Sequence, residues 1–286
     1  MLLGVAGFAS DWRGITAGVL EQASGLGFSA LQVRVPDPVE VRDKEIERIK
    51  GLFAAAGMAV GQTVGHYGGA LSSPDQNARA AAIKFVKRMC NLTGKLGAPN
   101  TYLRPGSLNS RGAWLPHRDN RSDEVFARLV DSAVQICRVA ENEGVTVAVE
   151  AGVVSPLYSP ARTRAFFDAV DSKSLAFNMD PVNVVGSLDD AFDTAGMMAR
   201  WFDALGHVTV GGHAKDFRLV EGLLPSFEEV PIGQGMLDHA AFLKGVQAAA
   251  PRGHVLIEHL MDEDIPAAAD ALRDVAGKAG IRWGGV

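Results

Sequence analysis

The sequence predicts an α/β protein built as one (β/α)8 TIM barrel, a single domain that spans residues 1–286. Short β-branched segments alternate with longer amphipathic segments from one end of the chain to the other, which is the pattern of repeated strand–helix units. No change in composition marks a linker between two domains. Eight strand–helix units in 286 residues fit a closed barrel.

The main alternative is an open, doubly wound sheet. Such a sheet usually carries a glycine-rich phosphate loop directly after its first strand. Here the first strand continues into GFASDWRG at residues 7–14, which matches neither the dinucleotide-binding fingerprint nor the Walker pattern. The later GQG at residues 233–235 is only a turn signal. The barrel is therefore favoured.

The expected elements follow from these patterns in chain order. Strands are expected near residues 2–8, 29–35, 59–65, 99–104, 145–150, 174–180, 207–213 and 253–258. Helices are expected near residues 12–25, 39–57, 76–96, 122–143, 160–170, 187–204, 238–249 and 265–279. In the helix at 122–143, Ser122 can cap the first turn and Gly144 ends the last one.

Composition and charge limit the kinds of partner. The chain is 47% hydrophobic and 21% charged, as in globular proteins with a substantial core, and its net charge of −5 argues against a broad nucleic-acid surface. Its apolar runs are too short to span a membrane, and no signal-peptide pattern is present. We therefore expect a cytoplasmic protein without membrane or nucleic-acid partners, in which Cys90 and Cys137 are buried, reduced thiols.

Four consecutive strands carry a residue that can bind a metal at the end of the inward-facing side. In VTVAVE, residues 145–150, the valines point one way and Thr, Ala and finally Glu150 point the other. The same alternation brings Asp180, His213 and Glu258 to the ends of the next three strands. Barrel enzymes build their sites at the carboxyl ends of the strands, so these side chains should converge. Three carboxylates and one imidazole suit a single divalent ion such as Mn²⁺, Mg²⁺, Co²⁺ or Zn²⁺.

Several motifs along the chain also resemble a known family. They are VAVEAG at 147–152, FNMDPVN at 177–183, HAKD at 213–216, VPIGQGMLDHAAFL at 230–243 and VLIEH at 255–259. With them, essentially the whole chain resembles the xylose isomerase-like TIM barrels, which include tagatose and psicose epimerases, hydroxypyruvate isomerases and inosose dehydratases.

The resemblance implies both the metal ligands and the reaction. Glu150, Asp180, His213 and Glu258 would hold one metal ion, and Glu150 and Glu258 would also act as acid and base. The implied reaction moves a proton next to a carbonyl in a small sugar, inosose or hydroxy acid through an enediolate. A metal at the carbonyl stabilises the enediolate, and a carboxylate on each face of the carbon permits removal and return of the proton.

Four further residues are expected to bind substrate. Arg104 ends the fourth strand on the inward phase, His66 follows the third strand, and Lys215 shares a face with His213. Asn183 stands where many epimerases of the family carry a histidine, and an amide can hydrogen-bond a hydroxyl but cannot relay a proton. A structural histidine, a salt bridge and a charge partner are the respective alternatives for His66, Arg104 and Lys215.

Other departures and alternatives stay open. The loop after the fifth strand lacks the second glutamate common in the family, and Arg218 lies only near the place of a substrate-binding arginine. A dehydratase or lyase of the same family and a non-catalytic polyol-binding barrel are the alternative functions. A DNA-repair endonuclease is disfavoured because QVRVP, residues 32–36, lacks the histidine it would need and because the chain is acidic.

Two structural questions follow from the sequence. Residues 105–122 form either a lid over the site or a packed loop. A homo-oligomer is compatible with the composition. His207, His239, His254 and His259 are expected to be structural.

Overall fold

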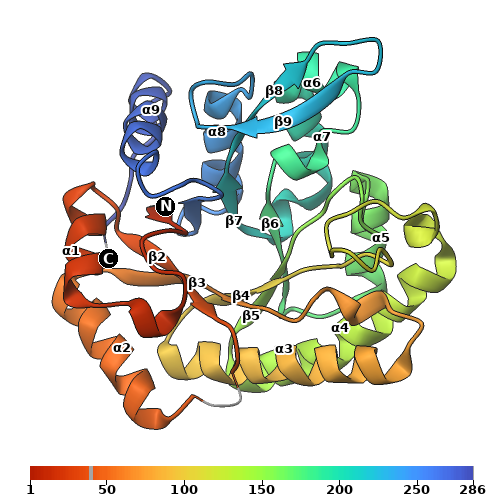
Figure 1. The fold of residues 1–286 in the computed structure, drawn as a ribbon, viewed down its shortest axis with the longest axis horizontal. Coiled ribbons are helices and arrows are strands. Elements are labelled where there is room, and N and C mark those ends of the chain that lie inside the picture. Colours follow the sequence, from red (N-terminus) through yellow and green to blue (C-terminus); the bar gives the residue numbers. More distant parts are fainter. Residues whose placement is uncertain (39–40, 286) are drawn as a thin grey trace.

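The computed structural model describes residues 1–38 and 41–285, in which eight parallel strands form a closed barrel. Barrel strands follow one another around the sheet, and β1 pairs with β10 to close it. The strands are β1 (Leu2–Val5), β2 (Ala30–Val35), β3 (Ala59–Gly65), β4 (Asn100–Leu103), β5 (Thr146–Val149), β6 (Leu175–Met179), β7 (Thr209–Ala214) and β10 (His254–Ile257). Helices lie around the outside of these strands (Figure 1). The predicted fold class is confirmed.

The helices that connect the strands follow the expected order. They are α1 (Ala17–Gly25), α2 (Asp43–Ala56), α3 (Gln76–Leu96), α4 (Asp123–Glu143), α5 (Pro160–Val170), α6 (Leu188–Phe192), α7 (Thr194–Leu205), α8 (His239–Ala249) and α9 (Ile265–Lys278). At the start of α4, the Ser122 side chain accepts a hydrogen bond from the Val125 N–H, and Gly144 ends the helix in the left-handed conformation.

Two predicted helices are interrupted. The segment 12–25 begins with a short 3-10 turn, and α1 starts only after Thr16, whose side chain caps it. The segment 187–204 is divided between α6 and α7, because the Asp193 side chain accepts a hydrogen bond from the Gly196 N–H and starts a new helix. Such side chains compete with the helical backbone, although the apolar periodicity continues across the break. The expected start of the helix at 39–57 lies outside the described residues, and α2 begins at Asp43.

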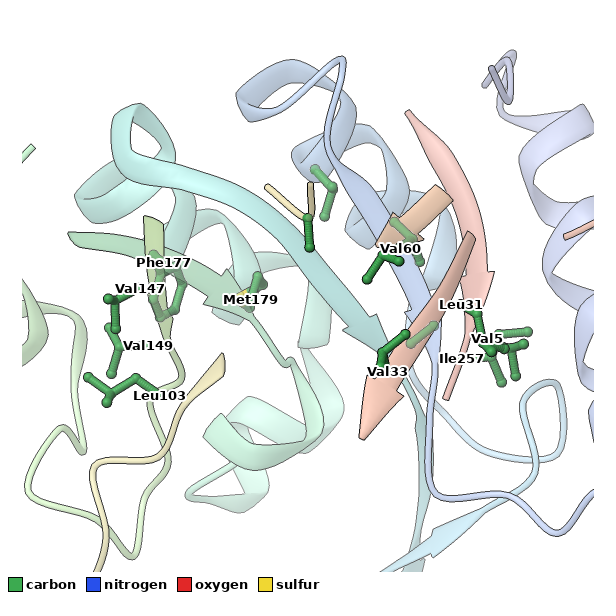
Figure 2. Close-up of a cluster of buried hydrophobic side chains, with 14 of the residues drawn as sticks. Val5, Leu31, Val33, Val60, Leu103, Val147, Val149, Phe177, Met179 and Ile257 are labelled. Carbon is green, nitrogen blue, oxygen red and sulfur yellow. The ribbon is translucent and has the colours of Figure 1, made fainter. Parts of the chain in front are cut away.

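The outward faces of the strands form the core between barrel and helices. Figure 2 shows Val147 and Val149 of β5 beside Phe177 of β6, and all three are buried. Phe177 stacks on Trp201 of α7 with the ring centroids 5.9 Å apart. Since successive side chains alternate along a strand, the residues between these ones point into the barrel. The packing of the helices thus fixes which side chains face the interior.

An antiparallel hairpin, β8 (Asp216–Val220) and β9 (Ser226–Val230), follows β7 and was not predicted. Only Lys215 separates β7 from β8, so the sequence reads there as one continuous strand. The hairpin projects from the barrel next to α6 and α7 (Figure 1).

Within the part of the chain that the structure describes, no helix has both the length and the apolar character needed to cross a bilayer.

Cys90 and Cys137 are both buried and free, as expected. Burial raises the pKa of the Cys90 thiol to about 12 and that of the Cys137 thiol to about 11. Both therefore stay protonated near neutral pH.

Candidate functional site

Four side chains converge at the carboxyl ends of the barrel strands. Glu150 and Asp180 directly follow β5 and β6, His213 lies in β7, and Glu258 directly follows β10. One oxygen or nitrogen from each lies within 4.8 Å of those from the other three. The sequence pattern therefore brings together the residues that it singled out as metal ligands. Their three carboxylates and one imidazole form a donor set that suits a divalent ion.

The His213 ring is oriented with one nitrogen toward the carboxylates. Its Nδ1 lies 2.5 Å from Oε1 of Glu150 and 3.0 Å from Oε2 of Glu258. This nitrogen is buried and makes no hydrogen bond of good geometry with the described residues. Burial lowers the pKa of His213, but the negative charges of Glu258 and Glu150 raise it by a larger amount. The pKa of His213 therefore lies well above its ordinary value. The two carboxylates thus favour a positive charge at this point, which a metal ion can supply.

A row of amides holds the other nitrogen of His213. Its Nε2 lies 3.0 Å from Oε1 of Gln62, an oxygen that also accepts a hydrogen bond from Nε2 of Gln32. Gln62 in turn donates through its own Nε2 to Oδ1 of Asn100. An amide oxygen only accepts, so Nε2 of His213 carries a proton and Nδ1 can offer a lone pair to a metal.

Glu150 is held by three donors. The Tyr102 hydroxyl donates to Oε2 at 3.0 Å, and Asn178 donates through Nδ2 to Oε1 at 2.9 Å. Asn183 donates through Nδ2 to Oε2 of Glu150 at 3.2 Å and to Oδ2 of Asp180 at 2.9 Å. These contacts fix the carboxylate at the end of β5, where the Glu150 side chain is only 2% exposed.

Lys215 lies beside the same cluster as a buried cation. Its Nζ is 2.7 Å from Oδ2 of Asp180 and 3.4 Å from Oε2 of Glu258. Burial lowers the pKa of Lys215, but Asp180 and Glu258 raise it above its ordinary value. Burial raises the pKa of Asp180 to about 6, against the opposing charge of Lys215. The side chain that the sequence suggested for substrate binding is therefore also a charge partner of the candidate ligands.

The cluster opens into a cavity of about 500 Å³, a size typical of small-molecule sites. The substrate-binding candidates His66, Arg104, Asn183 and Lys215 all line it. A larger, mostly apolar cavity of about 750 Å³ lies at the opposite end of the barrel, lined by residues such as Leu2, Phe53 and His254. None of the four candidate ligands borders that second cavity, so the chemistry belongs to the smaller one.

Comparison with known proteins identifies the family of this fold and site. The profile of the xylose isomerase-like TIM barrel family matches residues 20–276. The chain belongs to this family. 

Solved structures of xylose isomerase-like barrels share the fold at low sequence identity. The 3-keto-D-glucoside 4-epimerase of E. coli is 18% identical, with a TM-score of 0.72 over 97% of this chain and 99% of that one. A D-psicose 3-epimerase of Clostridium cellulolyticum H10, solved with D-tagatose, is 16% identical, with a TM-score of 0.73 over 99% and 100% of the two chains. A xylose isomerase-like protein of Mycobacterium smegmatis, solved in complex with magnesium, is 16% identical, with a TM-score of 0.70 over 98% and 96%.

In this xylose isomerase-like barrel, the unpredicted hairpin forms one wall of the cavity. Phe217 of β8 and Phe227 of β9 line it and pack edge to face, with the ring centroids 5.7 Å apart. Glu229 of β9 lies 2.9 Å from Nδ1 of His259. His259, which was expected to be structural, also lines the cavity, with its backbone in the left-handed region at φ 61°. Arg218 instead pairs with Glu228 on the hairpin and is exposed.

The segment 105–122 is tied down by its own polar groups. Ser107 donates through its hydroxyl to the carbonyl of Leu115 at 2.6 Å, and Asn120 donates through Nδ2 to the carbonyl of Val154 at 2.7 Å. Trp114 from this segment lines the cavity, and a Cβ on Gly152 would meet its ring at 2.5 Å. The packed-loop alternative fits these contacts better than a lid.

Proposed function

We propose that this protein is a divalent-metal-dependent isomerase or epimerase that moves a proton next to a carbonyl in a small sugar, inosose or hydroxy acid. The observation that carries this proposal is the position of His213 Nδ1 between Glu150 and Glu258, at 2.5 and 3.0 Å. Two carboxylates thus flank one point at the floor of a cavity, in a fold shared with sugar epimerases.

Each residue then has a distinct role. Glu150, Asp180, His213 and Glu258 would hold the ion, with Mn²⁺, Mg²⁺, Co²⁺ and Zn²⁺ as candidates. When bound, the ion polarises the substrate carbonyl and stabilises the enediolate charge. Glu150 and Glu258 remove the proton from one face of the carbon and return it to the other, or to the neighbouring carbon.

The remaining cavity residues would orient the substrate. Asn183 offers an amide to a substrate hydroxyl, and Lys215 offers a positive charge next to the developing enediolate. Arg104 and His66 also line the cavity. A cytoplasmic location, a homo-oligomeric state and the absence of nucleic-acid or membrane partners stay predictions from the sequence.

Deuterium exchange tests the proposal directly. The Mn²⁺-loaded protein is incubated in D₂O with ketoses, inososes and hydroxypyruvate, and we expect deuterium at the carbon next to the carbonyl in at least one of them. Glu258→Gln should lower the exchange rate by about 10²-fold or more, because it removes an acid–base group. Glu263→Gln, an exposed glutamate in the loop before α9, is the matched control and should exchange at the wild-type rate.

The outcomes separate the alternatives. Exchange by Glu258→Gln at the wild-type rate would contradict the two-glutamate mechanism. Loss of a β-hydroxyl together with exchange would assign a dehydratase of the same barrel. Metal and polyol binding without exchange in any compound would favour a non-catalytic binding barrel.

A further inference from the structure

The cavity lining is divided by charge. The candidate metal ligands and Glu229 lie on the side formed by β5, β6, β7, β9 and β10. Arg34 of β2, His66 after β3 and Arg104 after β4 line the other side. The two arginines therefore border the same cavity as Glu150 and Glu258.

Arg104 is held in place without a carboxylate partner. Its guanidinium carbon lies 5.6 Å from the ring centre of Tyr67 and 5.4 Å from that of Tyr102, within the range of cation–π contacts. The Tyr67 hydroxyl bonds to both the backbone N–H and the carbonyl of Arg104. Within residues 1–38 and 41–285, no aspartate or glutamate forms an ion pair with Arg104, and its buried Nε has no hydrogen-bond partner.

A polar group that is buried without a partner is costly, so such a group at a cavity wall is suited to a ligand. The net charge of the site agrees with a negative ligand. Four carboxylates, those of Glu150, Asp180, Glu229 and Glu258, face three cationic side chains, those of Arg34, Arg104 and Lys215. The Glu228–Arg218 pair cancels itself. With a divalent ion in place, one positive charge is left over.

Tyr102 connects the region around Arg104 with the candidate metal centre. The Tyr102 ring touches both regions, because its centre lies 5.4 Å from the Arg104 guanidinium and its hydroxyl 3.0 Å from Glu150. One small molecule can therefore reach both. A planar guanidinium matches a carboxylate, whereas phosphate sites commonly add a helix N-terminus or a glycine-rich backbone cradle. No α-helix begins among the described residues that line this cavity.

We propose that the substrate is a hydroxy-carbonyl acid of the sugar-acid type, whose carboxylate binds Arg104 while its carbonyl end faces Glu150 and Glu258. The proposal rests on the proposed function for the position of the reacting carbon. The carboxylate subsite itself rests on Arg104 and the charge of the cavity.

Matched ligands test the subsite. D-tagaturonate and D-fructuronate differ from D-tagatose and D-fructose by a carboxylate in place of a terminal hydroxymethyl group. Calorimetric titration of the Mn²⁺-loaded protein should give dissociation constants about tenfold or more lower for the acids, since a charge-assisted bond is stronger than a neutral one. Arg104→Met should abolish this difference between acids and neutral ketoses and leave the binding of Mn²⁺ unchanged. Arg252→Met, an exposed arginine at the opposite end of the barrel, is the control.

Each result has a defined meaning. Equal binding of acids and neutral ketoses by the wild-type protein would overturn the proposal, and so would stronger binding of fructose 6-phosphate than of either acid. If Arg104→Met does not fold, Arg104→Lys keeps the charge without the planar fork and should retain only part of the preference. Arg104-dependent acid binding without deuterium exchange would refute the proposed function but leave the carboxylate subsite in place.

Discussion

The Lys215 ammonium lies 2.7 Å from Oδ2 of Asp180, and both side chains are almost completely buried. The lysine reaches Asp180 because it continues the inward-facing side of β7 two residues beyond His213. A fixed cation therefore already neutralises part of the carboxylate cluster. It also lies close to the point where a divalent ion would bind, and like charges at short distance repel.

Lys215→Met should separate these two effects. Without added metal, the variant should lose roughly 3–5 kcal/mol of stability, because a buried carboxylate loses its partner. Its affinity for Mn²⁺ should stay equal or increase, because a competing positive charge is gone. Urea unfolding in EDTA and calorimetric Mn²⁺ titration measure the two quantities. Lys84→Met, an exposed lysine on α3, is the control. Unchanged stability in EDTA would show that the buried pair is not important for folding.

Gln62 should affect metal binding through its contact with His213. Gln62→Met keeps a similar size but removes the oxygen that lies 3.0 Å from Nε2 of His213. Loss of a hydrogen bond that orients a ligating histidine typically weakens metal binding by about 10–100-fold. Mn²⁺ titration of the variant should show this loss while circular dichroism stays unchanged. Gln22→Met on the exposed face of α1 is the matched control. Wild-type affinity in Gln62→Met would mean that His213 is held by the fold alone.

The positions of the candidate ligands could be predicted because they depend on a local rule. In a barrel whose helices cover the outer face, the apolar outward residues identify the inward ones by alternation. Val147 and Val149 are buried on the outer side, and Glu150 follows on the inner phase. The same reasoning applies to Met179, which is buried on the outer side of β6, and to Asp180, which follows it on the inner phase. Sequence alone therefore located the side chains that converge.

Contacts between distant segments could not be predicted in this way. Gln62 meets His213 across 151 residues, and nothing in the local pattern of β3 identifies that partner. The hairpin wall was missed because only one residue separates the end of β7 from the start of β8. His259 turns toward Glu229 through a left-handed backbone conformation, which is rare for a residue other than glycine and has no signature in a strand pattern.

Asp216 fixes the loop that follows the hairpin. Its carboxylate accepts hydrogen bonds from the N–H groups of Phe217, Gly233, Gly235 and Leu237. A Cβ on Gly235 would lie 2.2 Å from Oδ1 of Asp216, far inside van der Waals contact. The turn at residues 233–235 is thus part of the support for the cavity wall.

Gly235→Ala should therefore destabilise the protein by about 1–3 kcal/mol, the usual range for overpacking. It should also weaken substrate binding more than metal binding, because the displaced hairpin carries Phe217 and Phe227. Gly51→Ala in the middle of α2, where a Cβ meets nothing within 4 Å, should instead stabilise by roughly 0.5–1 kcal/mol. Urea unfolding compares the two variants. An equal effect of both would contradict the steric argument.

His254 lies at the end of the barrel opposite the candidate metal site, and its burial should make the stability of the fold depend on pH. It is 2% exposed, and its Nε2 has no hydrogen-bond partner among the described residues. Burial, with a smaller effect of His213, lowers its pKa from 6.5 to about 3. Between these two values the unfolded chain binds a proton that the folded protein does not bind. This part of the stability is therefore complete above pH 6.5 and decreases as the pH falls toward 3.

At about pH 5 the loss should reach roughly 2 kcal/mol relative to about pH 7.5. His254→Leu has a similar volume and no proton to bind. Between these two pH values its free energy of unfolding should therefore fall by roughly 2 kcal/mol less than that of the wild-type protein. Urea unfolding of both proteins at the two pH values gives the difference directly. His207→Leu, an exposed histidine in the turn before β7, should keep the wild-type pH dependence. Parallel pH profiles for wild type and His254→Leu would show that burial of this imidazole does not control the acid sensitivity of the fold.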